Sequence, residues 1–156
     1  MDRWVIPMIS MVCVAMPMYA FAGIADWQPY HSGNALELSL DRNAIWQEKD
    51  GLVHFINQER FVSPQFDAHY RIHFAIRRTR GFVDCARSRY VLTHADFYTA
   101  SNRLVWASLF PLPRHAWNWV RAPQGSVAHS MVTLVCQIAR TSTVSRKAGL
   151  HSHGHD

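Results

Sequence analysis

Two cysteines constrain the fold of this chain more than any other feature. The chain has three, but Cys13 lies inside an apolar N-terminal segment that has the features of a secretory signal, so a mature protein would keep Cys85 and Cys136. Two cysteines allow one pairing, and disulfides persist in the oxidising compartments that exported proteins enter. We therefore predict a Cys85–Cys136 disulfide, worth roughly 3–5 kcal/mol in the chain-entropy model. Two buried free thiols are the alternative, and the absence of a Cys-x-x-Cys spacing disfavours a metal pair.

The N-terminal segment predicts export. Arg3 supplies a short positive start, residues 4–18 carry no charge, and Ala20-Phe21-Ala22 is a small-x-small cleavage site. We expect residues 1–22 to be a cleaved signal peptide. The apolar run falls short of the roughly 20 residues that a membrane-spanning helix needs, so we expect no transmembrane segment once the signal is removed. The periplasm is the expected location, with the cell surface or secretion as alternatives.

The mature chain has the length of one domain, which we place at residues 23–140, followed by a flexible His-rich tail at residues 141–156. The net charge of the full chain is +5 and its pI is about 9.5. An exported basic protein meets envelope or matrix components before it meets nucleic acid, so no nucleic-acid partner is expected. The alternative for the clustered arginines is a solvated strand face. The arginines that could form a partner-binding patch are Arg71, Arg77, Arg78, Arg80, Arg87 and Arg89.

The middle of the chain has the pattern of an antiparallel sheet. Alternating leucines at residues 36–40 are typical of a half-buried strand, and Lys49-Asp50-Gly51 predicts the turn of a hairpin. Residues 70–76 alternate apolar and polar, which predicts a strand with Arg71 and His73 on the face opposite its aromatic row. Further strands are expected at residues 90–92 and 103–109. Successive strands with short connections favour antiparallel pairing.

Residues 126–138 fit two structures. As a helix, the segment would begin at Ser126 and bury a stripe of five apolar residues, with Cys136 off that stripe. As a strand, it would place Cys136 on a face with other apolar residues. The members of the helical stripe would be Val127, Met131, Leu134, Val135 and Ile138.

The sequence contains no Gly-x-Ser-x-Gly nucleophile turn, no His-Glu-x-x-His and no glycine-rich phosphate loop. His94-x-Asp96 fits an ordinary strand-end contact better than a catalytic pair. Trp117 and Trp119 share a face if their proline-flanked segment is extended, which makes them candidates for partner binding. We predict that the protein is not an enzyme.

Alternating histidines close the chain. Imidazoles spaced in this way suit copper, zinc or nickel, and a polar terminus without a function is the alternative. No other cofactor is expected. The candidate ligands are His151, His153, His155 and Asp156.

Several short motifs follow one another along residues 26–138 in a distinctive order: Trp27, Asp84-Cys85, Ser88-Arg89-Tyr90, Phe97-Tyr98, Val105, Ser108, Trp119, Pro123-Gln124-Gly125-Ser126 and Cys136. This order resembles that of the surface-adhesin protein E family of Gram-negative bacteria. The departures are the turn at residues 99–102, Gln124 within the Pro-Gly-Ser element, and the lack of a lipid-anchored cysteine.

The resemblance implies an α+β fold that is mainly β: an antiparallel sheet with a C-terminal helix tied to it by the disulfide. It also implies an adhesin-like binding role, with a protein or an envelope or matrix component as the partner. A homodimer is left open. The competing hypothesis is a periplasmic metal-binding protein that acts through its histidine tail.

Overall fold

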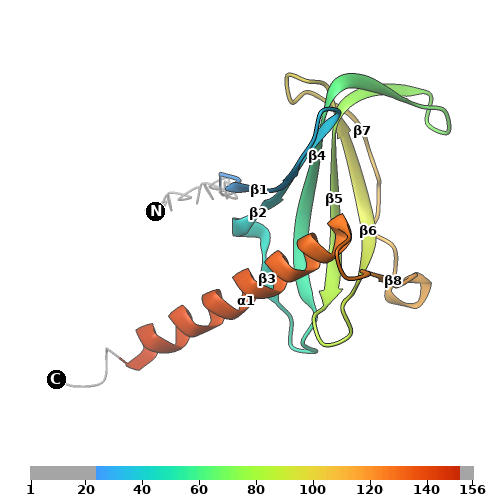
Figure 1. Ribbon diagram of the computed structural model, residues 1–156. Coiled ribbons are helices and arrows are strands. Elements are labelled where there is room, and N and C mark those ends of the chain that lie inside the picture. Colours follow the sequence, from blue (N-terminus) through green and yellow to red (C-terminus); the bar gives the residue numbers. More distant parts are fainter. Residues whose placement is uncertain (1–23, 152–156) are drawn as a thin grey trace, which may run out of the picture.

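The computed structural model describes residues 24–151, with side chains described to residue 142. Eight strands form one antiparallel sheet in the order β1-β2-β4-β5-β6-β7, with β3 paired to β4 and β8 paired to β6. One long helix, α1, crosses the sheet (Figure 1). The bounds are β1 Trp27–Ser32, β2 Leu36–Asp41, β3 Trp46–Gln47, β4 Val53–Asp67, β5 Ile72–Asp84, β6 Arg89–Tyr98, β7 Leu104–Ala107, β8 Val120–Arg121, the 3-10 helices η1 Arg42–Ala44 and η2 Arg114–Ala116, and α1 Val127–His151.

Two local predictions from the sequence are confirmed. The alternating leucines form β2, in which Leu40 is fully buried and pairs with Asn57 of β4. The predicted hairpin joins β3 to β4, where Trp46 pairs with His54. Gly51 in its turn has a φ of 86°, a conformation that glycine adopts without a steric penalty.

The strand predicted at residues 70–76 begins later than expected. Tyr70 and Arg71 belong to the turn between β4 and β5, and Arg71 has a φ of 54°. The Asp67 carboxylate stabilises this turn by accepting hydrogen bonds from the backbone N–H groups of His69 and Tyr70, at 2.9 and 3.0 Å. The prediction that Arg71 lies on a strand face is therefore wrong, because the alternation of side chains applies only from Ile72 onward.

Residues 127–138 are helical, as the resemblance implied. The Ser126 hydroxyl accepts a hydrogen bond from the backbone N–H of His129 at 3.1 Å, which is the geometry of an N-cap. The buried stripe differs from the predicted one, because Val127 is 39% exposed and Cys136 is buried. Packing against the sheet selects this face, so the expectation that Cys136 would lie off the stripe is wrong. The buried residues of α1 are Met131, Val132, Val135, Cys136 and Ala139.

The helix continues beyond the end expected for the domain. It runs to His151 and so extends into the segment that was expected to be a flexible tail, residues 141–156. The absence of an apolar period there is compatible with a helix that projects past the sheet, as α1 does in Figure 1. Among the described residues, no helix combines the length and the apolar character needed to cross a membrane.

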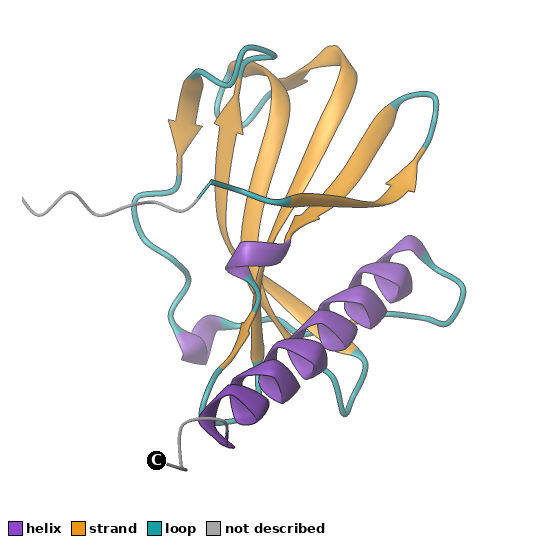
Figure 2. Ribbon diagram, turned by 90° about the vertical axis from the view of Figure 1, so that its left-hand side faces the viewer, coloured by secondary structure: helices purple, strands orange, loops and turns teal. Residues whose placement is uncertain are grey.

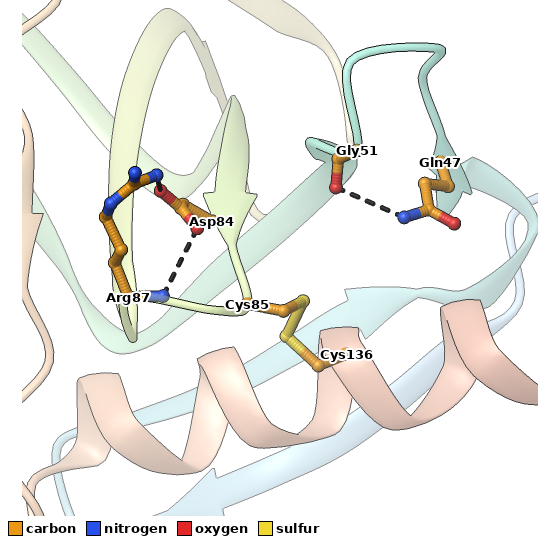
Figure 3. Close-up of a disulfide and its surroundings, with 6 residues drawn as sticks. All are labelled: Gln47, Gly51, Asp84, Cys85, Arg87 and Cys136. Carbon is orange, nitrogen blue, oxygen red and sulfur yellow. Dashed lines mark hydrogen bonds and ion pairs between the residues drawn. A yellow bond between two sulfur atoms is a disulfide. The ribbon is translucent and has the colours of Figure 1, made fainter.

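A disulfide joins the sheet to the helix, as predicted. Cys85 directly follows β5, Cys136 lies in the middle of α1, and their Cα atoms are 5.9 Å apart (Figure 3). The preceding residue, Asp84, accepts hydrogen bonds from the backbone and the side chain of Arg87. Asp84 therefore stabilises the turn that presents Cys85 to the helix.

The main core lies between the sheet and α1. Val53, Phe55 and Val83 contact the buried stripe of the helix in one cluster. Side chains alternate along a strand, so His54 and Phe82 lie on the opposite face. We call this second face, turned away from α1, the outer face.

Candidate binding site on the outer face

The segment that follows β7 covers part of the outer face. Residues 108–119 leave β7, pass through η2 and lie across the sheet from α1 (Figure 2). Trp117 of this segment stacks on Phe82 of β5, with ring centroids 4.8 Å apart and an interplanar angle of 23°. Phe82 alternates with the core residue Val83, so this contact lies on the face away from the helix.

Five rings form a continuous strip along this face. Trp46 stacks on His54 with centroids 3.7 Å apart, and the His54 ring meets the edge of Phe82 at 5.5 Å. Beyond Phe82, Trp117 meets Trp119 edge to face at 5.7 Å. We call these residues the aromatic strip. The prediction that Trp117 and Trp119 lie on one face agrees with their contact, but both also pack within the protein.

Cations cover several of these rings. The Arg114 guanidinium lies 5.0 Å from the centroid of Trp117 and pairs with Glu48 and Asp50. The hydrogen bond from Arg114 lowers the pKa of Asp50 and raises that of Arg114 itself. At the other end of the strip, Arg89 lies 4.5 Å from the centroid of Trp119. Each such cation–π pair contributes about 0.5–1 kcal/mol at an exposed site. The contacts of Arg114 and Arg89 therefore help to hold residues 108–119 in place.

The predicted arginine patch does not form one surface. Arg77 shares the helix-side face with Val83 and pairs with Glu59 at 2.6 Å, whereas Arg78 and Arg80 lie on the outer face. Arg71 lies in the turn at the far end of the β4–β5 hairpin. The sequence could not separate these residues, because the strand that carries most of them alternates between two faces.

Most of these arginines also have internal partners. Arg80 pairs with Asp96 at 2.9 Å, and Arg87 and Arg89 both pair with Asp84 at 3.0 Å. Burial alone would raise the pKa of Asp84, but hydrogen bonds from the two arginines outweigh it and hold that pKa below its usual range.

The last arginine, Arg78, lies over the rings of Trp27 and Tyr98, at 5.2 and 4.5 Å from their centroids. It also donates hydrogen bonds to the side-chain oxygens of Gln58 and Asn102, at 2.9 and 2.8 Å. These partners of Arg78 are neutral, and Arg87 and Arg89 share one carboxylate, so the ion pairs neutralise the predicted cationic patch only in part.

A short loop carries the most conspicuous apolar surface of this face. Leu109 is 88% exposed, Phe110 is 82% exposed and Leu112 is 49% exposed. We call residues 109–112 the apolar loop. This loop was not predicted from the sequence, and Leu109 was assigned to a strand at residues 103–109, whereas β7 ends at Ala107. Three large apolar residues around Pro111 were a signal that could have identified the loop.

The apolar loop is held at both ends. The backbone N–H of Ser108 donates to the Ala95 carbonyl at 2.9 Å, and that of Leu112 donates to the Thr93 carbonyl at 2.8 Å. The indole Nε1 of Trp117 donates to the Leu112 carbonyl at 2.9 Å. These bonds fix the loop to β6, so its exposed side chains have a defined position.

A pocket of about 440 Å³ lies between the apolar loop and the sheet. Its apolar wall includes Phe82, Leu109, Leu112 and Trp117. The size is that of pockets that bind small molecules, and most such pockets combine apolar walls with a few polar groups. A second hollow, of about 430 Å³ between η1 and α1, has a mainly polar lining and lacks an aromatic wall.

The polar side of the outer-face pocket contains Arg80, His54 and His94. The nearly buried Asp96 carboxylate contacts Arg80 and lies 3.0 Å from Nε2 of His94. Burial lowers the pKa of His54, whose Nδ1 donates to the Ala44 carbonyl at 2.9 Å. Because Asp96 has Arg80 as a second partner, the His94–Asp96 pair belongs to a network that orients side chains toward the pocket.

The predicted metal ligands lie outside the part of the chain whose side chains are described. This applies to His151, His153, His155 and Asp156. The predicted signal peptide, residues 1–22, also lies outside the described residues. Within residues 24–142 no group of three or more His, Cys, Asp or Glu side chains is placed to hold a metal ion.

No family model matches the chain, and no curated protein matches it by sequence. The structure is similar to crystal form II of Haemophilus influenzae protein E, with a TM-score of 0.48 and 13% identity over 74% of this chain and 97% of that chain. The selenomethionine form of protein E has a TM-score of 0.47 and 13% identity, over 74% of this chain and 95% of that chain. A third structure of protein E has a TM-score of 0.47 and 13% identity, over 73% of this chain and 92% of that chain. At this identity no residue role transfers, and the family stays a prediction.

Proposed function

We propose that this chain is an exported, non-enzymatic binding protein that engages a protein partner through the outer face, in the manner of an adhesin. The observation that carries the proposal is the apolar loop. Leu109 and Phe110 are almost fully exposed on a loop that backbone hydrogen bonds hold in place. Adjacent exposed apolar side chains on a fixed backbone are typical of protein–protein contact sites.

The chemistry of the face favours recognition over catalysis. The thiols of Cys85 and Cys136 are joined in the disulfide, which removes both as nucleophiles. The charged groups around the strip pair with one another, as Arg114 does with Glu48 and Asp50. We therefore expect the partner to be held mainly by apolar contacts, with only a weak dependence on salt.

Export is part of the proposal. The disulfide supports an oxidising compartment, and the N-terminal pattern supports a cleaved signal. Fractionation of producing cells would test both: the expected species lacks residues 1–22 and is found in the periplasm, on the surface or in the medium. A full-length species in the cytoplasm would contradict the proposal.

The docking role is tested by a photo-crosslinking amino acid placed at Phe110 in producing cells. We expect a discrete adduct with another protein, and we expect Leu109→Ser with Leu112→Ser to abolish it. The matched control is the same amino acid at Val62, which is 73% exposed at the other end of the sheet. Equal adducts from both positions, or none from position 110, would argue against the apolar loop as the docking site.

A second candidate function is metal binding by the C-terminal histidines, favoured by the alternation of His151, His153 and His155. Copper or zinc titrated into the mature chain should bind more tightly than to a chain that ends at Leu150. Equal affinity in the two chains would remove this candidate.

A further inference from the structure

We propose that the outer-face pocket binds a small organic anion with an apolar body, such as a medium-chain carboxylate. This goes beyond the proposed docking function, because the pocket lies beneath the apolar loop and Phe110 is not part of its lining. The two sites share Leu109 and Leu112, so they are distinguished by Arg80, which lines the pocket and lies outside the apolar loop, and by Phe110, which belongs to the loop alone.

The apolar half of the pocket suits a hydrocarbon or aromatic body. Phe82 and Trp117 are stacked on each other and both line the pocket, while Leu109 and Leu112 close it from the loop side. Removing apolar surface from water is the main favourable term for such a ligand. The volume of about 440 Å³ accommodates a small molecule but not a folded chain.

The polar half of the pocket suits an anion. Its ionisable lining residues are Arg80, His54 and His94, and none of the lining residues is acidic. Asp96 lies behind them with only 4% of its surface exposed. Arg80 is therefore the cation of the lining, and the Asp96 carboxylate is not among the lining groups.

Arg80 keeps capacity for a ligand. Its Nη2 donates to the Asp96 carboxylate at 2.9 Å, while the side chain stays 47% exposed. A guanidinium has five N–H donors in a planar fork that matches a carboxylate. The contact with Asp96 uses one side of the fork and orients the rest.

The pocket is organised before a ligand arrives. Asp96 fixes Arg80 and His94, and Trp117 fixes the loop through the Leu112 carbonyl. A site whose groups are already ordered spends less entropy on binding. The geometry thus provides a rigid apolar wall opposite an oriented cation.

Titration calorimetry with sodium octanoate and the mature, disulfide-bonded protein tests the proposal. We expect saturable binding of one octanoate, and weak or no binding of octylammonium, which has the same chain and the opposite charge. Arg80→Gln should lower the affinity for octanoate at least about ten-fold, which is the loss expected for a charge-assisted hydrogen bond. The control is Arg103→Gln, which removes the same charge from an exposed arginine in the β6–β7 turn.

A second variant keeps the test valid if Arg80→Gln disturbs the sheet. Leu109→Asp places a carboxylate at the exposed rim of the pocket and should weaken octanoate by about three- to ten-fold, through repulsion of like charges. Val62→Asp is its control on a distant exposed site. The proposal is overturned if octanoate does not bind or if octylammonium binds as tightly as octanoate. It is also overturned if the control variants lower the affinity for octanoate as much as the pocket variants do.

Discussion

Gly81 of β5 lies against the backbone of Val91 on β6, so closely that a Cβ atom on Gly81 would be 2.0 Å from the Val91 carbonyl oxygen. The Phe55 ring occupies the space beside it, at 3.1 Å from the same position. The pairing of β5 with β6 shifts register at this point, between Arg80 and Gly81. A side chain here would push the two strands that carry the pocket apart.

We predict that Gly81→Ala destabilises the protein by about 1–3 kcal/mol or more, because the methyl group can be accommodated only by a backbone shift. Urea unfolding of the variant measures the change. Gly33→Ala is the matched control, since its Cβ would meet ordinary contacts at 3.7 and 3.9 Å. If the two variants unfold at the same urea concentration, the backbone of residue 81 does not lie as close to the Val91 carbonyl as described.

Replacing both cysteines tests the link between sheet and helix. The disulfide spans a sequence separation of 51 residues. For a loop of that length the chain-entropy model gives about 4 kcal/mol, which the Cys85→Ala, Cys136→Ala variant should lose. Thermal unfolding without reductant measures it. A reducing agent should lower the melting temperature of the wild type and leave that of the variant unchanged; a response from both would point to another cause.

His54 should make the fold sensitive to mild acid. Burial lowers its pKa below the ordinary value of 6.5, so near that pH the unfolded chain binds more protons than the folded one. The contribution of His54 to stability is therefore complete above about pH 7 and falls as the pH drops through the unfolded pKa toward the lower folded one.

The measurement is the free energy of unfolding between pH 8 and pH 5 for the wild type and for His54→Gln. The variant should show a shallower loss over this range. His69→Gln, in the exposed turn between β4 and β5, is the matched histidine substitution at a site away from the core. An unchanged slope in His54→Gln would mean that His54 does not contribute to the pH dependence.

We expect the indole N–H of Trp117 to help hold the apolar loop in place. Trp117→Phe keeps a ring for stacking on Phe82 but removes the donor to the Leu112 carbonyl, at a cost of about 1 kcal/mol. Hydrogen exchange of the Leu112 amide, which donates to the Thr93 carbonyl, should become faster. Trp119→Phe is the control, and faster exchange of the same amide there would show that bulk, not the hydrogen bond, fixes the loop.

Local patterns predicted much of the fold. The leucine alternation gave β2 and Gly51 marked the β3–β4 turn, because each depends on a few adjacent residues. Arg71 was misplaced because the end of a long hairpin depends on where Asp67 forms its turn. The buried stripe of α1 was misplaced because the sheet, together with the disulfide at Cys136, decides which side of the helix is covered.

The candidate site was less accessible to sequence reasoning. Trp117 was identified as a candidate, but its partner Phe82 lies on another element and is known only from the folded chain. Arg80 and His94 meet because β5 and β6 pair in one register, and no local pattern fixes that register. Counting arginines predicted a patch, whereas pairing with Asp84 and Asp96 is a property of the tertiary structure.

The disulfide also closes a covalent ring. The backbone from Cys85 to Cys136, shut by the S–S bond, contains β6, β7, the apolar loop and the aromatic segment that ends at Trp119. A protease that cuts once between Leu109 and Leu112 would open this ring without releasing a fragment, and the mass would rise by one molecule of water. Two pieces would separate only after reduction, so a nicked molecule in an oxidising environment keeps its outer face assembled.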